Sequence, residues 1–294
     1  MASTNSRMSK LDLANLDRRI IFLCIAVAVI IPMILKKTMP FPTSPVVQSI
    51  FDKMESMPAG SPVLLSFDYG PSTEPENQPM AEAITRHCMI KNFRLIMMAV
   101  WATGPPQIDK TINNVIKVDF PDKVYGENYI NIGFKAGNQG LINAILRDLK
   151  SIYTTDVQGK DVNTFPILKD ITNLRNISLI IGIGSGYPGV KEWIQFGSDP
   201  AQVPMAGGMT AVEAPLLYPY YPKQLLGLMG GLLGAAEYEA ALVKKYPQYK
   251  TTKEKPQNTE QAIKSMVPQT VAHIVIIIFI ILGNIFYFLE KRNL

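Results

Sequence analysis

The stretch Ser178-Leu179-Ile180-Ile181-Gly182-Ile183, followed directly by Gly184-Ser185-Gly186-Tyr187-Pro188-Gly189, decides the fold class. Its first half is a short, uninterrupted apolar run, which is typical of a strand that is buried on both faces. Its second half is a glycine-rich turn, and residues 189–196 have the pattern of a short helix. A buried strand that leads through a turn into a helix is the repeating unit of parallel α/β sheets.

The same unit recurs along the chain. Apolar runs alternate with helical patterns, and turn signals such as Asp68-Tyr69-Gly70-Pro71 end the runs. We therefore predict an α/β fold with a Rossmann-like, mostly parallel sheet of about five strands and helices on both faces. The predicted strands are residues 63–67, 95–101, 129–134, 178–183 and 203–212, and the predicted helices are residues 47–57, 78–92, 108–118, 141–152, 189–196 and 223–245.

Two further segments are apolar throughout and are bounded by charged residues. Residues 20–35 lie between Arg18-Arg19 and Lys36-Lys37, and residues 271–289 are followed by Glu290-Lys291-Arg292. Flanking Lys and Arg side chains help such segments to cross a hydrocarbon core of about 30 Å. The alternatives are a cleaved signal peptide and a buried core helix, but Lys36-Lys37 is not the small-residue pattern of a cleavage site. We predict two transmembrane helices.

Two spans place both termini on one side of the membrane. The basic residues near the termini assign that side to the cytoplasm by the positive-inside tendency, so the domain is expected to be extracytoplasmic, on the cell (inner) membrane. The predicted parts are a cytoplasmic N-terminus (1–19), a first transmembrane helix (20–37), a lead-out segment (38–60), the α/β domain (61–246), a tether (247–269), a second transmembrane helix (270–289) and a cytoplasmic tail (290–294).

Composition argues against several functions. The net charge of the 294 residues is +5, and no helix or loop gathers the Lys/Arg cluster that nucleic acid requires. The chain has two histidines and two cysteines, and His273 and Cys24 fall in the predicted spans. His87 and Cys88 are neighbours on a predicted helix, so their side chains diverge and cannot form a nucleophile–base pair. We predict no catalytic residue, no metal and no cofactor, and favour a non-enzymatic role.

The glycine-rich turn is a candidate binding site. Its glycines match G-x-G-x-x-G, a pattern that lets backbone N–H groups approach a pyrophosphate. Its late position and Pro188, which lacks an N–H, favour an ordinary turn instead. Polar and aromatic residues at the strand ends suggest a crevice for a small molecule, although such residues most often cap turns. The candidate ligand-binding residues are Asp68, Trp101, Thr103, Gly184, Ser185, Gly186 and Glu213.

A second set of glycines predicts close packing. The segment 225–236 contains two G-x-x-x-G spacings, and glycine costs about 1 kcal/mol in a helix interior relative to alanine. Such glycines therefore indicate close approach, either within the domain or against another subunit. Polar groups within an apolar span usually face another helix. The candidate packing residues are Gly227, Gly230, Gly231, Gly234, Gly283 and Asn284.

Several of these segments together resemble a known group of proteins. The chain is similar to a group of uncharacterised prokaryotic membrane-anchored proteins in the segments Leu64-Leu65-Ser66-Phe67-Asp68-Tyr69, Gln78-Pro79-Met80-Ala81, Tyr187-Pro188-Gly189 with Lys191-Glu192-Trp193, and Ala214-Pro215 through Tyr218-Pro219-Tyr220 with Gly234-Ala235-Ala236-Glu237-Tyr238-Glu239. The resemblance covers nearly the whole chain but implies no activity. The layout also resembles auxiliary subunits of ABC exporters, including those of gliding bacteria, which place an α/β domain between two terminal spans. That likeness concerns the layout alone.

The sequence thus favours a non-enzymatic accessory or structural subunit of an oligomeric cell-envelope membrane complex. Its expected partners are the lipid bilayer and either copies of itself or other membrane subunits. The alternative is a membrane-anchored domain that binds or senses a small-molecule ligand through the glycine-rich turn and the strand end at Asp68.

Overall fold

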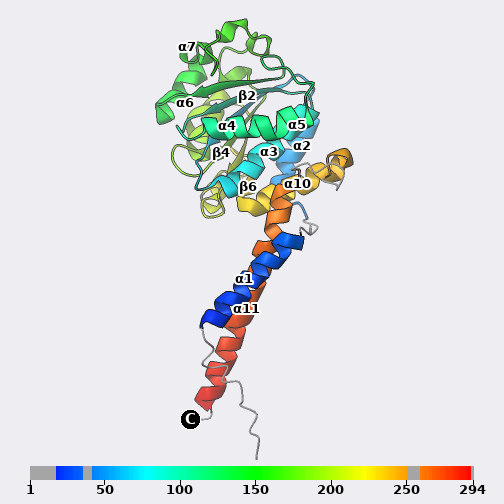
Figure 1. The fold of residues 1–294 in the computed structure, drawn as a ribbon. Helices are drawn as coiled ribbons and strands as arrows, with labels where there is room; N and C mark the ends of the chain where they lie inside the picture. The colour runs from blue at the N-terminus through cyan, green and yellow to red at the C-terminus, as the bar shows by residue number, and fades with distance from the viewer. Residues whose placement is uncertain (1–17, 36–41, 251–258, 293–294) are drawn as a thin grey trace, which may run out of the picture. The chain divides into compact units, whose positions relative to one another are not determined.

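The computed structural model describes residues 18–35, 42–250 and 259–292 and divides the chain into two compact units. Pro40–Ile263 form the unit that holds the α/β domain, and Met1–Met39 with Lys264–Leu294 form the unit that holds the apolar helices (Figure 1). Most of the expected cytoplasmic N-terminus, the start of the lead-out, the middle of the tether and the end of the tail lie outside the described residues.

The domain is built on one six-stranded, all-parallel sheet with the order β3-β2-β1-β4-β5-β6 (Figure 1). The register places Leu64 of β1 beside Ile96 of β2 and Ile180 of β4, so the central strands are buried as their apolar sequences predict. The strands are β1 (Pro62–Asp68), β2 (Arg94–Ala99), β3 (Tyr129–Phe134), β4 (Leu179–Gly184), β5 (Met205–Met209) and β6 (Gly227–Gly230).

Helices cover both faces of the sheet. Successive residues of a strand point to opposite faces. A Cβ on Gly207 would lie 2.8 Å from Val190, which begins one helical segment, whereas a Cβ on Gly208 would lie 2.7 Å from Met80 of another. The helical segments are α2 (Pro45–Ser56), α3 (Glu74–Ile90), α4 (Pro105–Thr111), η2 (Ile112–Ile116), α5 (Lys117–Asp119), α6 (Asn138–Arg147), α7 (Leu149–Ile152), η3 (Val162–Thr164), η4 (Pro166–Leu168), η5 (Leu174–Asn176), α8 (Val190–Glu192), η6 (Trp193–Ser198), α9 (Asp199–Ala201), η7 (Ala214–Tyr220), α10 (Gly231–Lys245) and η8 (Pro247–Tyr249).

The sixth strand corrects the sequence prediction of a single helix over residues 223–245. Gly227–Gly230 form β6 at the edge of the sheet, and α10 begins only at Gly231, whose φ is +59°. Two glycines in four residues weaken a helix, while pairing with β5 satisfies the backbone N–H and C=O groups.

Helix α2 covers this edge strand. The Ser49 hydroxyl donates to the Leu226 carbonyl at 2.6 Å, and the Ser44 backbone N–H donates to the Glu237 carboxylate of α10 at 3.0 Å. A Cβ on Gly227 would lie 2.5 Å from the Val46 carbonyl, so α2 lies directly against the strand backbone. A covered edge strand does not present a row of unpaired backbone N–H and C=O groups to another chain.

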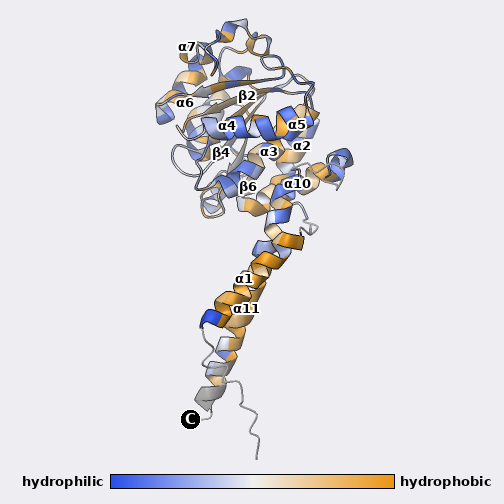
Figure 2. Cartoon of the chain, in the orientation of Figure 1, coloured by the Kyte–Doolittle hydropathy of each residue, from blue (hydrophilic) through white to orange (hydrophobic). Residues whose placement is uncertain are grey.

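The two remaining helices are α1 (Arg18–Leu35) and α11 (Gln261–Arg292). Both are long and apolar enough to cross a membrane, with mean hydropathy of 2.4 over Arg18–Leu35 and 2.2 over an 18-residue window of Gln261–Ile285. Figure 2 shows hydrophobic residues along both helices and mixed polarity on the helices of the domain.

The first turn of α11 is capped by a side chain of the domain. The buried Glu239 carboxylate of α10 accepts hydrogen bonds from the backbone N–H groups of Ala262 and Ile263, both at 3.0 Å. Burial raises the pKa of Glu239 to about 8, although both backbone donors favour its ionised form. Two of the four N–H groups that a helix leaves unpaired at its start are satisfied in this way.

Gly227→Ala is expected to destabilise the domain by about 1–3 kcal/mol, because the added methyl group must push α2 away from β6. The matched control is Gly140→Ala near the start of α6, where a Cβ meets nothing within 4 Å. There the substitution is expected to stabilise by up to about 1 kcal/mol. Urea unfolding of the detergent-solubilised chain measures both changes. Equal effects at the two positions would contradict the close contact between α2 and β6.

Candidate functional site

The carboxyl ends of β1 and β4 form the place where open parallel sheets usually bind ligands. These strands are neighbours at the centre of the sheet, and the helical segments that follow them, α3 and α8, pack on opposite faces. The Thr73 hydroxyl donates to the Ser185 hydroxyl at 2.8 Å, and the Asn77 amide donates to the Gly184 carbonyl at 3.1 Å. The loops after the two strands are therefore tied together.

Asp68, at the end of β1, points into the protein and is fully buried. Its carboxylate accepts hydrogen bonds from the Val100 backbone N–H at 2.9 Å, the Ser66 hydroxyl at 2.8 Å and the Trp193 indole N–H at 2.8 Å. Burial raises the pKa of Asp68 to about 7, while these donors act to lower it. The side chain thus joins β1, the end of β2 and η6, and it is not exposed at the rim of the sheet.

Two N–H groups of the glycine-rich turn donate to acceptors within the chain. The Gly189 N–H donates to the Glu192 carboxylate at 2.8 Å, and the Ser185 N–H donates to the Asp68 carbonyl at 3.1 Å. Pro188 offers no N–H. The Gly189 N–H, a donor of the kind that a dinucleotide-binding turn offers to a phosphate group, is therefore already bonded to a carboxylate of the chain.

The start of α3, next to this turn, is likewise occupied by acidic side chains. Glu74 pairs with Lys110, and the Glu76 carboxylate accepts a hydrogen bond from the Ala211 backbone N–H at 2.8 Å. Negative side chains at a helix N-terminus interact favourably with the helix dipole and repel an anionic ligand. The helical segments that follow β1 and β4 therefore both have carboxylate side chains of the chain itself near their N-termini.

The other predicted ligand-binding residues lie in two groups. The Trp101 indole N–H donates to the Pro188 carbonyl at 2.7 Å, and a Cβ on Gly186 would lie 3.2 Å from the Trp101 ring and 3.9 Å from the Glu213 carboxylate. These three predicted residues are therefore neighbours. Thr103 lies instead beside Gly70, with its hydroxyl donating to the Tyr69 carbonyl at 3.2 Å.

A hollow of about 390 Å³ lies beside this group, among the segments that follow β2, β3 and β4. It contains two of the predicted ligand-binding residues, Trp101 and Thr103, and its lining has no charged side chain. Such a lining can hold an apolar or aromatic group, and the hydroxyl groups of Thr103 and Tyr187 in it donate to the Tyr69 carbonyl and the Gln139 side chain. The hollow is lined by Val100, Trp101, Ala102, Thr103, Phe134, Ala136, Asn138, Tyr187 and Pro188.

The predicted packing glycines of the domain take part in contacts within it. Cβ atoms on Gly231 and Gly234 would lie 2.6 Å from Ala211 and 2.7 Å from Met229, so the start of α10 lies tightly against neighbouring backbone. A Cβ on Gly230 would lie 3.1 Å from Ala214. In α11, by contrast, a Cβ on Gly283 would meet nothing within 4 Å, and the exposed Asn284 amide donates to the Ile280 carbonyl of its own helix.

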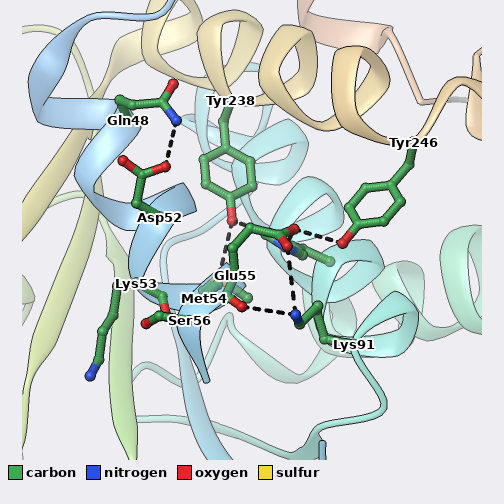
Figure 3. A network of polar contacts seen from close by, with 10 residues as sticks. Gln48, Asp52, Lys53, Met54, Glu55, Ser56, Lys91, Tyr238 and Tyr246 are labelled. Carbon is green, nitrogen blue, oxygen red and sulfur yellow. Dashed lines mark hydrogen bonds and ion pairs between the residues drawn. The ribbon is translucent and has the colours of Figure 1, made fainter. Parts of the chain in front are cut away.

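A polar network among α2, α3 and α10 is a feature that sequence reasoning missed (Figure 3). The Glu55 carboxylate accepts from the Tyr246 hydroxyl at 2.6 Å and lies 2.9 Å from His87 Nε2. The Tyr238 hydroxyl lies 2.6 Å from His87 Nδ1, and the Lys91 ammonium donates to the Glu55 backbone carbonyl at 2.9 Å. These contacts join three helices.

The charge states within the network follow from its geometry. Burial acts to raise the pKa of Glu55, but hydrogen bonds from Tyr246 and His87 outweigh it and lower that pKa below its ordinary value. An ionised carboxylate only accepts hydrogen bonds, so His87 Nε2 carries the proton and Nδ1 accepts from Tyr238. Burial lowers the pKa of His87 to about 4, and the ring is therefore neutral at neutral pH.

The described residues supply few groups for catalysis. Within residues 18–35, 42–250 and 259–292, no group of three or more His, Cys, Asp or Glu side chains could hold a metal ion. Cys88 is buried, and burial raises the pKa of its thiol far above the ordinary value. A buried, protonated thiol is a poor nucleophile.

No protein-family model matches the chain, and no curated protein matches it significantly.

Some of the missed residues left a signal in the sequence. Glu192 stands three positions after Gly189 and forms the second half of a capping box, a spacing that can be read without a structure. Glu74 and Glu76 likewise stand in the first turn of α3, where acidic residues are enriched. The partnership of Trp193 with Asp68 left no such signal, because 125 residues separate them.

Asp68→Asn is expected to lower the free energy of unfolding by about 2 kcal/mol. An amide has a single accepting oxygen, so it leaves either the Val100 N–H or the Trp193 indole N–H without a partner in the core. Asp122→Asn, at a side chain that is 73% exposed, is the control and is expected to change little. Chemical denaturation of the two variants measures both changes. Unchanged stability of Asp68→Asn would rule out this structural role of the carboxylate.

The neutral His87 predicts a loss of stability at low pH. Its pKa is about 4 in the fold against 6.5 when unfolded, so between these values the unfolded chain binds the extra proton. Stability therefore rises with pH in this window and falls by up to about 3 kcal/mol as pH drops through it.

Comparison with His87→Gln isolates this effect, because other titrating groups contribute to both proteins. The stability advantage of the native chain over the variant is expected to shrink as the pH is lowered from 7 to about 4. Urea unfolding at constant ionic strength gives the difference at each pH. A difference that stays constant over that range would show that His87 is not held neutral.

Proposed function

We propose that this chain is a non-enzymatic accessory or structural subunit of an oligomeric membrane complex. In this proposal α1 and α11 anchor it in the cell (inner) membrane, with both termini in the cytoplasm and the α/β domain outside. The two apolar helices support the anchoring, each being long enough to span a bilayer.

One observation carries the non-enzymatic part of the proposal. The strand order β3-β2-β1-β4-β5-β6 supports a doubly wound, Rossmann-like sheet, and in sheets of that kind ligands bind at the carboxyl ends of the central strands. The Gly189 N–H after β4 and the Ala211 N–H after β5 are bound by Glu192 and Glu76 of the chain itself. A nucleotide or other anion would have to displace carboxylates that already satisfy these donors.

The open face of α11 supports association within the membrane. Gly283 leaves space for the backbone of another helix, and Asn284 places a polar amide in an apolar stretch. Small residues permit close helix packing in lipid, and polar groups there usually face a partner helix. The partner is a second copy of the chain or another membrane subunit.

Extraction of the full chain with its surrounding lipid into polymer-bounded discs tests the proposal. The particle is expected to be heavier than one copy, and Gly283→Leu is expected to reduce the fraction of that particle several-fold. The control is Ile281→Leu, which lies about 200° round the helix and leaves bulk unchanged. A single copy without any other protein, in native and variant samples alike, would refute the proposal.

The hollow beside Trp101 favours a second candidate, a membrane-anchored ligand-binding domain. The hollow of about 390 Å³ has no charged side chain in its lining and suits a small molecule better than the glycine-rich turn does. An electron-microscopy map of the extracted particle separates the two. Density for a small molecule in the hollow of a one-copy particle would favour the ligand-binding domain.

A further inference from the structure

The segment between β5 and β6 displays large apolar side chains to solvent. Val212 is 85% exposed, Leu216 70% and Tyr218 53%, and Leu233 at the start of α10 is 46% exposed. Isolated exposed side chains are common on soluble proteins, but several within one short segment mark a contact surface. We call these four residues the 212–233 patch.

The segment holds these side chains outward by regular structure. In η7 the buried residues Ala214 and Leu217 stand three positions apart, which is the repeat of a 3₁₀ helix. The Tyr220 hydroxyl, three positions further, accepts a hydrogen bond from Gln195 at 2.9 Å. Leu216 and Tyr218 lie between the positions that face the domain.

Leu233 belongs to the same region of the surface. A Cβ on Gly231 would lie 2.6 Å from Ala211, so the chain just before Val212 touches the chain just before Leu233. The charged groups here are the half-buried Glu213 and Glu76, of which Glu76 accepts a hydrogen bond from the Ala211 N–H, and the exposed Lys223 at the end of the segment.

From these observations we infer that the 212–233 patch rests on the surface of a lipid bilayer. The inference rests on the proposed function, because α1 and α11 must hold the domain near a membrane. Only residues 36–44 separate the end of α1 from α2, so the domain stays close to the bilayer and a weak surface contact becomes populated.

The chemistry of the patch also favours lipid over a protein partner. Tyrosine beside aliphatic side chains, with a lysine next to them, is the composition of segments that lie at membrane–water interfaces. Four side chains expose only a few hundred Å², whereas a stable protein interface buries about 800 Å² on each partner. Lys223 adds attraction to anionic headgroups.

The chain offers a direct test by site-specific labelling. Cys24→Ala removes the exposed cysteine, and the buried Cys88 does not react with a bulky reagent. A cysteine is then introduced by Leu216→Cys in the full-length chain and labelled with an environment-sensitive fluorophore. The control is Val157→Cys, at a side chain that is 50% exposed and lies beside β3.

The labelled chains are reconstituted into vesicles of phosphatidylcholine and phosphatidylglycerol in equal parts. The label at position 216 is expected to emit at shorter wavelength and to be quenched several-fold more than the label at 157 by lipids that carry a nitroxide near the headgroup. Lys223→Glu is expected to weaken that quenching in these vesicles but not in vesicles of phosphatidylcholine alone.

Each other outcome overturns the inference or the function beneath it. Equal quenching at both positions places the patch in water. A blue-shifted label at 216 that lipid nitroxides do not quench places the patch against a second copy of the chain. Failure of the chain to float with the vesicles on a density gradient contradicts the membrane anchoring itself, and so separates the two proposals.

Discussion

The architecture of the domain depends on one buried carboxylate at the centre of its sheet. Asp68 ends β1, and its two oxygens accept from the backbone after β2 and from the indole of η6. A carboxyl group without water around it must be hydrogen-bonded, so the neighbouring segments have only one arrangement that satisfies it. The loops that follow β1 and β4 are positioned around this group, and the carboxyl edge of the sheet takes its shape from it.

Most of the fold could be predicted because its pattern is local. The apolar runs at β1 to β5 are buried strands, and the two charge-bounded runs are the helices α1 and α11. The predicted helix over residues 141–152 is interrupted, since the Asp148 side chain accepts from the Ser151 N–H and starts a new turn. The strand β6 was missed because its glycines read as helix-packing residues, whereas the contact that requires glycine is made by α2, far away in the sequence.

The candidate site was less predictable, because its chemistry is decided by partners that are distant in the chain. Strand-end logic correctly brings Trp101, Gly186 and Glu213 together, since the carboxyl ends of parallel strands share one edge. It gives no information about which way Asp68 points or that Trp193 donates to it. The hydrogen bond from the Gly189 N–H to the Glu192 carboxylate likewise depends on side-chain direction, although the spacing of these two residues is that of a capping box.

The cover that α2 forms over β6 has a consequence for the order of events during synthesis. Ser49 bonds Leu226 across 177 positions, and Ser44 bonds Glu237 across 193, so nearly the whole domain must leave the ribosome before this seam can close. Until then the apolar side of α2 has no packing partner. The apolar residues of α2 therefore remain exposed on the nascent chain until nearly the whole domain has been synthesised.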